Sequence, residues 1–278
     1  MIKSPAKINL FLHVLGKDYR GYHLLESLAV FVPELFDKIK IRKGRANEVV
    51  FTGPWRDRIG QQNTVTKALE LLAKHIPDKF QISIEKNIPV GAGLGGGSSN
   101  AGSIIRYLLN KYKIQIPKKI VLELCNQIGS DVAMFMYAKA LYIRGTGDIF
   151  THLKSFPSVS ILIIYPKIEL STQHVYNLGF KRFSKQMPSK LSFSSQCPLI
   201  ADLQLKKNDL YPNALKIFPQ LKPLITVIKE TKGCLLARMT GSGSACFGLF
   251  DGVKNANLSL KTLQKRFPDY SIYIGNIK

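Results

Sequence analysis

A run of glycines between two segments of different periodicity is the feature that most constrains this chain. Residues 89–99 read PVGAGLGGGSS. Residues 80–88 alternate apolar and polar side chains, which predicts a half-buried strand, and a helix is predicted from Ser98 or Ser99 to about Tyr112. The chain therefore has to form a strand, a glycine-rich loop and a helix in direct succession.

The composition of this loop suggests that it binds an anion. Glycine reaches positive φ and lets the backbone come close to a ligand. Free amides at the start of a helix, together with the helix dipole, attract negative charge. Ser98 and Ser99 add hydroxyls that can contact a phosphate oxygen or a magnesium ion. We interpret the segment as a phosphate-binding loop, and a flexible loop or a tight helix–sheet contact is the less favoured alternative.

Two common nucleotide motifs do not fit the loop. Residues 91–96 match the pattern GxGxxG, but a dinucleotide site needs an acidic residue about twenty positions later, and residues 111–118 contain none. A Walker loop needs a lysine directly after its last glycine, and Ser98 stands there instead. Neutralising a phosphate would therefore fall to backbone amides, a metal ion and a lysine from elsewhere.

Charge and cysteine content limit the function classes. The 278 residues include 40 Lys and Arg against 18 Asp and Glu, which gives a formal net charge of +22. This excess fits a nucleic-acid-binding protein, a basic solvated surface or a phosphate-rich substrate. Charge alone does not separate the three, and we do not favour nucleic acid. The four cysteines form no CxxC pair, and no segment reaches the length of a membrane helix. We expect a cytoplasmic protein in a reducing compartment, without zinc, nucleic-acid or membrane partners; the oligomeric state is not predicted.

The periodicity along the chain predicts an α+β protein without the regular alternation of a doubly wound sheet. Strands are expected at 8–15, 27–32, 38–42, 80–88, 140–143, 159–165, 235–239, 245–250 and 270–274. Helices are expected at 63–75, 98–112, 117–128, 172–178, 212–218, 221–232 and 254–267. Residues 181–198 are rich in Ser and Lys and are expected to be an exposed insertion. The predicted domains are 1–153 and 154–278.

Five polar residues outside the loop are further candidates for chemistry. They are Lys7, Asn9, Tyr22, His23 and Asp131. Lys7 precedes an apolar strand, where its ammonium would be partly desolvated, but most lysines in so basic a chain lie on the surface. An ordinary turn explains Tyr22 and His23 equally well, and a helix N-cap explains Asp131.

Taken together, five segments resemble the motifs of the GHMP-superfamily small-molecule kinases. In chain order they are SPAKINLFL at 4–12, GYH at 21–23, the loop at 89–100, GSD at 129–131 and MTGSGSA at 239–245. The first two segments resemble most closely the branch that phosphorylates a sugar alcohol joined to cytidine diphosphate in isoprenoid precursor biosynthesis. The resemblance implies a ribosomal S5 domain 2-like N-terminal domain, a ferredoxin-like C-terminal domain, and the use of ATP and Mg²⁺.

The resemblance also implies a role for individual residues. Asp131 would take the proton of the attacking hydroxyl, and Lys7 would keep Asp131 ionised and stabilise the transferring group. ATP would be bound by Pro89, Val90, Gly91, Ala92, Gly93, Leu94, Gly95, Gly96, Gly97, Ser98 and Ser99 and by Asn63, which would lie near the adenine or ribose. The substrate would be bound by Asn9, Tyr22, His23, Thr172, Tyr176, Thr240, Gly241 and Ser242. Tyr22 would stack on the cytosine and His23 would bond its edge. Ser99 is a candidate magnesium contact, and no residue is assigned as a direct metal ligand.

Three alternatives stay open at this point. Another GHMP kinase would act on mevalonate, homoserine or galactose, but such substrates have no base for residues 21–23 to recognise. A nucleic-acid-binding protein would show affinity that falls steeply with salt. A non-catalytic relative would bind nucleotide only, and the presence of both Lys7 and Asp131 argues against it.

Overall fold

The computed structural model describes residues 1–137, 139–188 and 190–277. The chain forms two compact units. The first comprises Met1–Ala6, Leu35–Val90 and Gly95–Ala138, and the second comprises Lys7–Glu34, Gly91–Leu94 and Lys139–Lys278. Each unit is assembled from separate stretches of the chain, whereas the sequence predicted two domains divided at a single point after residue 153. That division stays a prediction.

The observed elements alternate irregularly between strands and helices. The strands are β1 Ile2–Lys17, β2 His23–Gly44, β3 Glu48–Thr52, β4 Lys79–Glu85, β5 Leu141–Arg144, β6 Ile149–His152, β7 Val159–Tyr165, β8 Cys234–Met239, β9 Cys246–Phe250 and β10 Ser271–Ile277. The α-helices are α1 Thr64–Leu72, α2 Gly96–Lys111, α3 Lys118–Ile128, α4 Thr172–Asn177, α5 Gln196–Gln204, α6 Tyr211–Ile217, α7 Leu221–Lys229 and α8 Val253–Arg266. Two short 3-10 helices lie at Arg56–Arg58 and Ala133–Met136.

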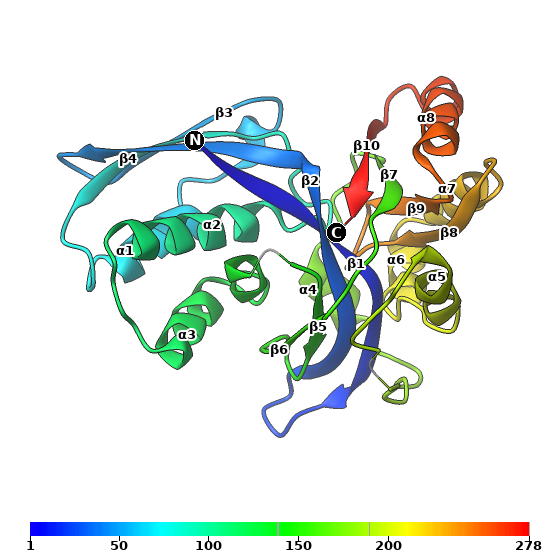
Figure 1. Cartoon of the computed structure of the whole chain (residues 1–278), viewed down its shortest axis with the longest axis horizontal. Helices are drawn as coiled ribbons and strands as arrows, with labels where there is room; N and C mark the ends of the chain where they lie inside the picture. The colour runs from blue at the N-terminus through cyan, green and yellow to red at the C-terminus, as the bar shows by residue number, and fades with distance from the viewer. Residues whose placement is uncertain (138, 189, 278) are drawn as a thin grey trace. The chain divides into compact units, whose positions relative to one another are not determined.

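In the first unit, helices pack against a small sheet. β4 pairs in parallel with β3 and antiparallel with the second half of β2. Helices α1 and α2 lie side by side along this sheet, as Figure 1 shows. The apolar spacing of α1 explains its position, since Val65, Ala68, Leu69 and Leu72 are all buried.

The second unit contains the first half of β2, which pairs with β1 and β5. The turn between β1 and β2 is closed by Asp18, whose carboxylate accepts backbone N–H groups from Arg20 and Tyr22. This hairpin carries Lys7 and Asn9 on one strand and His23 at the beginning of the other.

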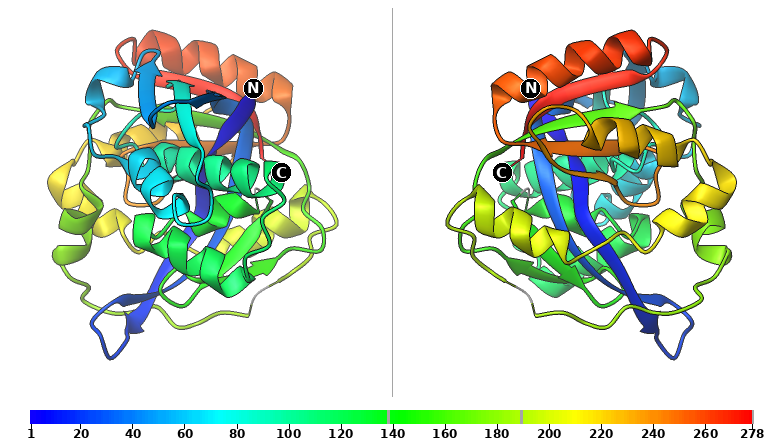
Figure 2. Two further views of the ribbon diagram at one scale, coloured as in Figure 1. Left: turned by 90° about the vertical axis from the view of Figure 1, so that its left-hand side faces the viewer. Right: turned by 90° about the vertical axis from the view of Figure 1, so that its right-hand side faces the viewer.

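The second unit also contains a four-stranded antiparallel sheet in the order β10-β7-β9-β8. Counted within the sheet, this is the order 4-1-3-2 of a ferredoxin-like split βαβ arrangement. Helices α7 and α8 pack on it (Figure 2). All seven residues of β7 are buried. The expected α+β class and ferredoxin-like C-terminal part are therefore confirmed.

Two expectations about elements were wrong. The strands expected at 27–32 and 38–42 are one continuous strand, β2, which runs through Pro33. β3 and β6 were missed because both are short and lack a buried face along their length. Residues 181–198 are mostly exposed among those described, as expected, but they include the buried Phe193 and the beginning of α5. Within the described residues, no helix has both the length and the apolar character that crossing a bilayer requires.

Candidate active site

The glycine loop has the backbone of an anion-binding site. Gly91, Gly93 and Gly95 have φ of 70°, 77° and 69°, values that side-chain-bearing residues rarely adopt. Gly95 is the N-cap of α2 and supplies no side chain to the helix end. The first amides of the helix have no acceptor within it, and its first turn contains no acidic residue. The sixteen-residue helix therefore presents donors and the positive end of its dipole to the loop.

The middle of the loop, Gly91–Leu94, lies against backbone of the second unit. A Cβ added at Gly93 would lie 2.9 Å from the Thr240 carbonyl oxygen and 3.0 Å from that of Gly243. The Ala245 N–H donates to the Ala92 carbonyl at 3.2 Å. The predicted Thr240–Ser244 loop therefore packs directly on the glycine loop.

Two residues that the sequence did not single out also shape this region. Asn208 donates to the carbonyls of Met239 and Gly241 at 2.9 and 2.8 Å and so holds the loop that contains Thr240. Glu169 packs beside Gly91, since a Cβ added at this glycine would collide with the Glu169 side chain. Neither residue belongs to a motif, so only the fold identifies them.

The flanks of the glycine loop in the first unit border a buried polar cluster. The cluster contains Asp37, Lys86 and Asn100, none of which was predicted. The alternation of the strands could have revealed two of them. Asp37 and Lys86 fall two positions after the buried apolar residues Leu35 and Ile84, where the pattern calls for another apolar side chain.

Ser99 is held by internal hydrogen bonds. Its fully buried hydroxyl donates to the Pro5 carbonyl and accepts from the Ser4 hydroxyl, each at 2.7 Å. The suggested magnesium contact of Ser99 would require this hydroxyl to leave the Pro5 carbonyl. Ser98 is the more exposed of the two hydroxyl residues.

Lys7 and Asn9 lie next to each other in the second unit. The buried Lys7 ammonium donates to Asn9 Oδ1 at 2.5 Å, and Asn9 Nδ2 donates to Ser27 Oγ at 2.8 Å. A Cβ added at Gly241 would lie 3.3 Å from Lys7 Nζ. Asp131 is half-buried in the first unit, between α3 and the 3-10 helix at Ala133–Met136. The pairing of Lys7 with Asp131 joins one residue from each unit and stays a prediction.

An aromatic cluster surrounds His23 in the second unit. The centroid of its ring lies 5.0 Å from that of Tyr176 and 5.2 Å from that of Phe180. Burial, followed by the charge of Lys17, lowers the pKa of His23. Phe180 was not predicted. Tyr22 is 63% exposed and has Arg20 over its ring at 5.3 Å.

Thr172 and Ser242, two of the predicted substrate residues, are in contact. Their hydroxyl oxygens lie 2.8 Å apart. Thr240 lies close to Asn9, since its side-chain oxygen accepts the Asn9 backbone N–H at 2.8 Å. The predicted substrate residues of the second unit therefore include three contacting pairs: Asn9 with Thr240, Thr172 with Ser242, and His23 with Tyr176.

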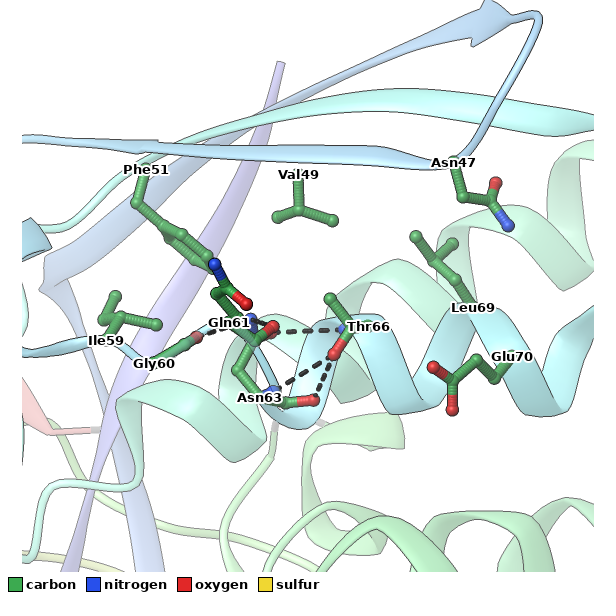
Figure 3. Close-up of a pocket in the computed structure, with 10 residues that line it drawn as sticks. All are labelled: Asn47, Val49, Phe51, Ile59, Gly60, Gln61, Asn63, Thr66, Leu69 and Glu70. Carbon is green, nitrogen blue, oxygen red and sulfur yellow. Dashed lines mark hydrogen bonds between the residues drawn. The ribbon is translucent and has the colours of Figure 1, made fainter.

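Asn63 lines a cavity of about 370 Å³ in the first unit (Figure 3). Its side chain caps α1, with Oδ1 accepting from the amides of Val65 and Thr66. Its Nδ2 donates to the carbonyls of Gly60 and Gln61, each at 3.2 Å. The remaining walls are Asn47, Val49, Phe51, Ile59, Leu69 and Glu70. Asn63 therefore shapes the rim of the cavity, with its amide already engaged.

Comparison with known proteins agrees with this architecture. Family profiles described as the GHMP kinases N terminal domain and the GHMP kinases C terminal match residues 63–139 and 189–268. The chain belongs to the GHMP kinase family. The resemblance seen in the sequence motifs is thus confirmed.

Particular relatives carry a more specific name. A 4-diphosphocytidyl-2-C-methyl-D-erythritol kinase of Wolbachia pipientis wMel is 36% identical over 97% of this chain and 95% of its own length. The protein of that name from Ehrlichia ruminantium (strain Gardel) is 37% identical over 100% and 98%. A crystal structure of 4-(cytidine 5'-diphospho)-2C-methyl-D-erythritol kinase superposes with a TM-score of 0.79 and 28% identity, covering 99% of this chain and 98% of the other.

Proposed function

We propose that this protein transfers the γ-phosphoryl group of ATP to the 2-hydroxyl of 4-diphosphocytidyl-2-C-methyl-D-erythritol. The full-length similarity to relatives named for this activity carries the proposal. The anion-binding loop at the start of α2 and the aromatic cluster around His23 support it, because a triphosphate and a pyrimidine base are the two groups that the reaction has to bind.

In the proposed reaction, the substrate hydroxyl oxygen forms a bond to the γ-phosphorus while the bond to the bridging oxygen of ADP breaks. Asp131 accepts the hydroxyl proton, and the Lys7 ammonium stabilises charge on the transferring group. Since phosphoryl transfer depends mainly on positioning and charge stabilisation, the rigid contacts of Gly93 with Thr240 and of Lys7 with Asn9 serve the same reaction.

Binding of ATP would use the loop and the cavity of the first unit. Amides of residues 95–98 would bind phosphate, and the apolar side chains of Val49 and Phe51 would contact the adenine. Magnesium would neutralise phosphate charge when bound. Among the described residues no cluster of three or more His, Cys, Asp or Glu side chains could hold it, so the nucleotide phosphates would supply most of its ligands. The half-buried Ser98 is the more exposed of the two loop serines.

The proposed setting is the reducing cytoplasm, with a small molecule rather than nucleic acid as partner. All four cysteines are free thiols, and burial raises the pKa of Cys125 to about 12, which keeps that thiol unreactive. If instead the net charge of +22 served nucleic acid, the logarithm of affinity would fall steeply with the logarithm of salt concentration.

A turnover assay tests the function. Purified protein with ATP and Mg²⁺ is offered the diphosphocytidyl alcohol and, separately, mevalonate, homoserine and galactose. Phosphorylation of the first substrate alone is expected. Asp131→Asn should abolish turnover and leave binding of a non-hydrolysable ATP analogue intact. Absence of phosphorylation of the diphosphocytidyl alcohol would contradict the function, and unchanged turnover in the variant would contradict the assignment of the base.

A further inference from the structure

A buried charged cluster borders the phosphate loop and has no part in the mechanism above. Asp37, Lys86 and Asn100 are 0%, 2% and 1% exposed. Asp37 and Lys86 lie one position beyond the paired residues Lys38 and Glu85 of β2 and β4, so the sheet register places the two opposite charges across from each other. All of these residues belong to the first unit.

The Asp37 carboxylate is bonded to both ends of the loop. Its Oδ1 accepts the backbone N–H groups of Asn87 and Ile88 at 2.7 and 2.8 Å, directly before Pro89. Its Oδ2 accepts Asn100 Nδ2 at 2.9 Å, and Asn100 lies in α2 directly after Ser99. One side chain therefore joins the residue that enters the loop to the helix that leaves it.

Lys86 and Ser4 complete the cluster. The Lys86 ammonium donates to Asp37 Oδ2 and to Asn100 Oδ1. It also lies next to the beginning of α2, because a Cβ added at Gly96 would be 3.3 Å from Lys86 Nζ. Asn100 Nδ2 donates to Ser4 Oγ at 3.0 Å. Every acceptor and donor of the Asp37 and Asn100 side chains thus points to a residue that borders the loop or packs beside it.

Stability alone does not account for such a cluster. Removing two charges from water is costly, and buried ion pairs can often be replaced by apolar side chains without loss of stability. An apolar pair could fill the same space, but it could not accept the N–H groups of Asn87 and Ile88. What the carboxylate adds is a fixed geometry for the backbone on each side of the loop.

We propose that Asp37 is a positioning residue for ATP, which holds Ile88 and Asn100 so that the loop between them keeps the backbone needed to bind the triphosphate. This inference rests on the proposed kinase function. Asp37 and Asn100 are fully buried and bonded to the flanks of the loop, so their effect is expected on nucleotide binding and not on the proposed cytidine recognition by residues of the second unit.

The test compares two ligands in two variants by calorimetry. Asp37→Asn puts an amide against the two donors Lys86 and Asn100, and Asn100→Ala frees the helix end without removing a charge. Each variant is expected to weaken binding of the magnesium complex of AMP-PNP tenfold or more and to change binding of cytidine diphosphate by less than twofold. Because Asp37→Asn leaves a buried ammonium poorly paired and can fail to fold, Asn100→Ala decides in that case.

Asp78→Asn is the matched control. Asp78 also belongs to the first unit and is bonded to Lys43 and Tyr112, away from the loop. Both ligands should bind this variant as they bind wild type. Equal weakening of both ligands in Asn100→Ala, or wild-type binding of AMP-PNP in folded Asp37→Asn and Asn100→Ala, would overturn the positioning role. Wild-type protein that binds no AMP-PNP would overturn the kinase function as well, and this result needs no variant.

Discussion

On the side that belongs to the first unit, the glycine loop is bordered by buried side-chain charges, whereas in the second unit it lies against backbone. Asp37 and Asn100 hold the first side through hydrogen bonds to each other, to the Asn87 and Ile88 N–H groups, and to Lys86 and Ser4. Gly93 makes the second side possible, because the carbonyls of Thr240 and Gly243 leave no room for a Cβ.

The difference shows which substitutions each side tolerates. A side held by ions depends on charge and hydrogen-bonding geometry, and removing one partner leaves the other buried and unpaired. A side held by close backbone contact depends on the absence of a side chain and is insensitive to charge. The loop is therefore vulnerable to chemically different changes on its two sides.

The largest expected effect comes from breaking the ion pair. Lys86→Met leaves Asp37 buried without its cation, and we expect the free energy of unfolding in urea to fall by about 3–5 kcal/mol. Lys38→Met is the control, since the Lys38–Glu85 pair is partly exposed and should contribute about 1 kcal/mol or less. If both variants lost the same free energy of unfolding, the buried ion pair would contribute no more than the surface pair, which would contradict this prediction.

The second effect comes from adding a side chain on the other flank. Gly93→Ala places a Cβ against two carbonyls at φ 77°, so we expect a loss of about 1–3 kcal/mol in stability and a fall in kcat/KM of about 100-fold. Gly97→Ala is the matched control, because its φ is unstrained and its nearest neighbour would be the Thr64 hydroxyl at 3.2 Å. The alanine there should leave stability within about 1 kcal/mol or raise it. Urea denaturation measures the stability of both variants, and steady-state kinetics measures kcat/KM of Gly93→Ala.

A third variant loosens the backbone that supports Gly93. Asn208→Ala removes the donor to the carbonyls of Met239 and Gly241, and buried acceptors without partners cost about 1–3 kcal/mol. Asn257→Ala removes an exposed amide that bonds the Val253 carbonyl and should change stability by about 0.5 kcal/mol or less. If Asn208→Ala leaves stability unchanged, the hydrogen bonds of Asn208 to Met239 and Gly241 are not needed to hold the backbone that packs against Gly93.

The smallest effect concerns pH and separates cytidine recognition from the loop. Burial, with Lys17 second, lowers the pKa of His23 below its usual 6.5, so the unfolded chain binds a proton before the folded chain does as pH falls. The stability contribution of neutral His23 is therefore complete above pH 6.5 and is lost as pH falls from 6.5 through the lowered folded pKa. Binding of cytidine diphosphate should weaken over the same range more than binding of AMP-PNP does.

Proton NMR of the His23 ring follows this titration. Lys17→Met should move its pKa back toward the usual value, and Lys40→Met should not. A pKa that does not respond to Lys17, or parallel weakening of both ligands with acid, would contradict the assignment.

Much of the fold could be predicted from local patterns. The strand at 159–165 and the helices near 64–72 and 118–128 follow from apolar spacing alone, and the glycine loop was placed correctly between its strand and helix. These elements carry their own signal because burial repeats with a period of two or of 3.6.

The parts that sequence could not supply depend on register between distant strands. The pairing of Asp37 with Lys86 requires knowing that β2 and β4 align at Lys38 and Glu85. The hydrogen bonds of Ser99 to Pro5 and of Asn208 to Gly241 likewise join residues far apart in the chain. The strands expected at 27–32 and 38–42 are likewise one strand, which continues through Pro33.

The length of β2 has a consequence for how such a chain can change over generations. The strand begins with His23 in one unit and reaches Asp37 in the other (Figure 1). Since successive side chains of a strand point to opposite faces, one inserted or deleted codon between the two would turn one of them away from its partners. Insertions and deletions should therefore be rare between His23 and Asp37, so that this span keeps its length.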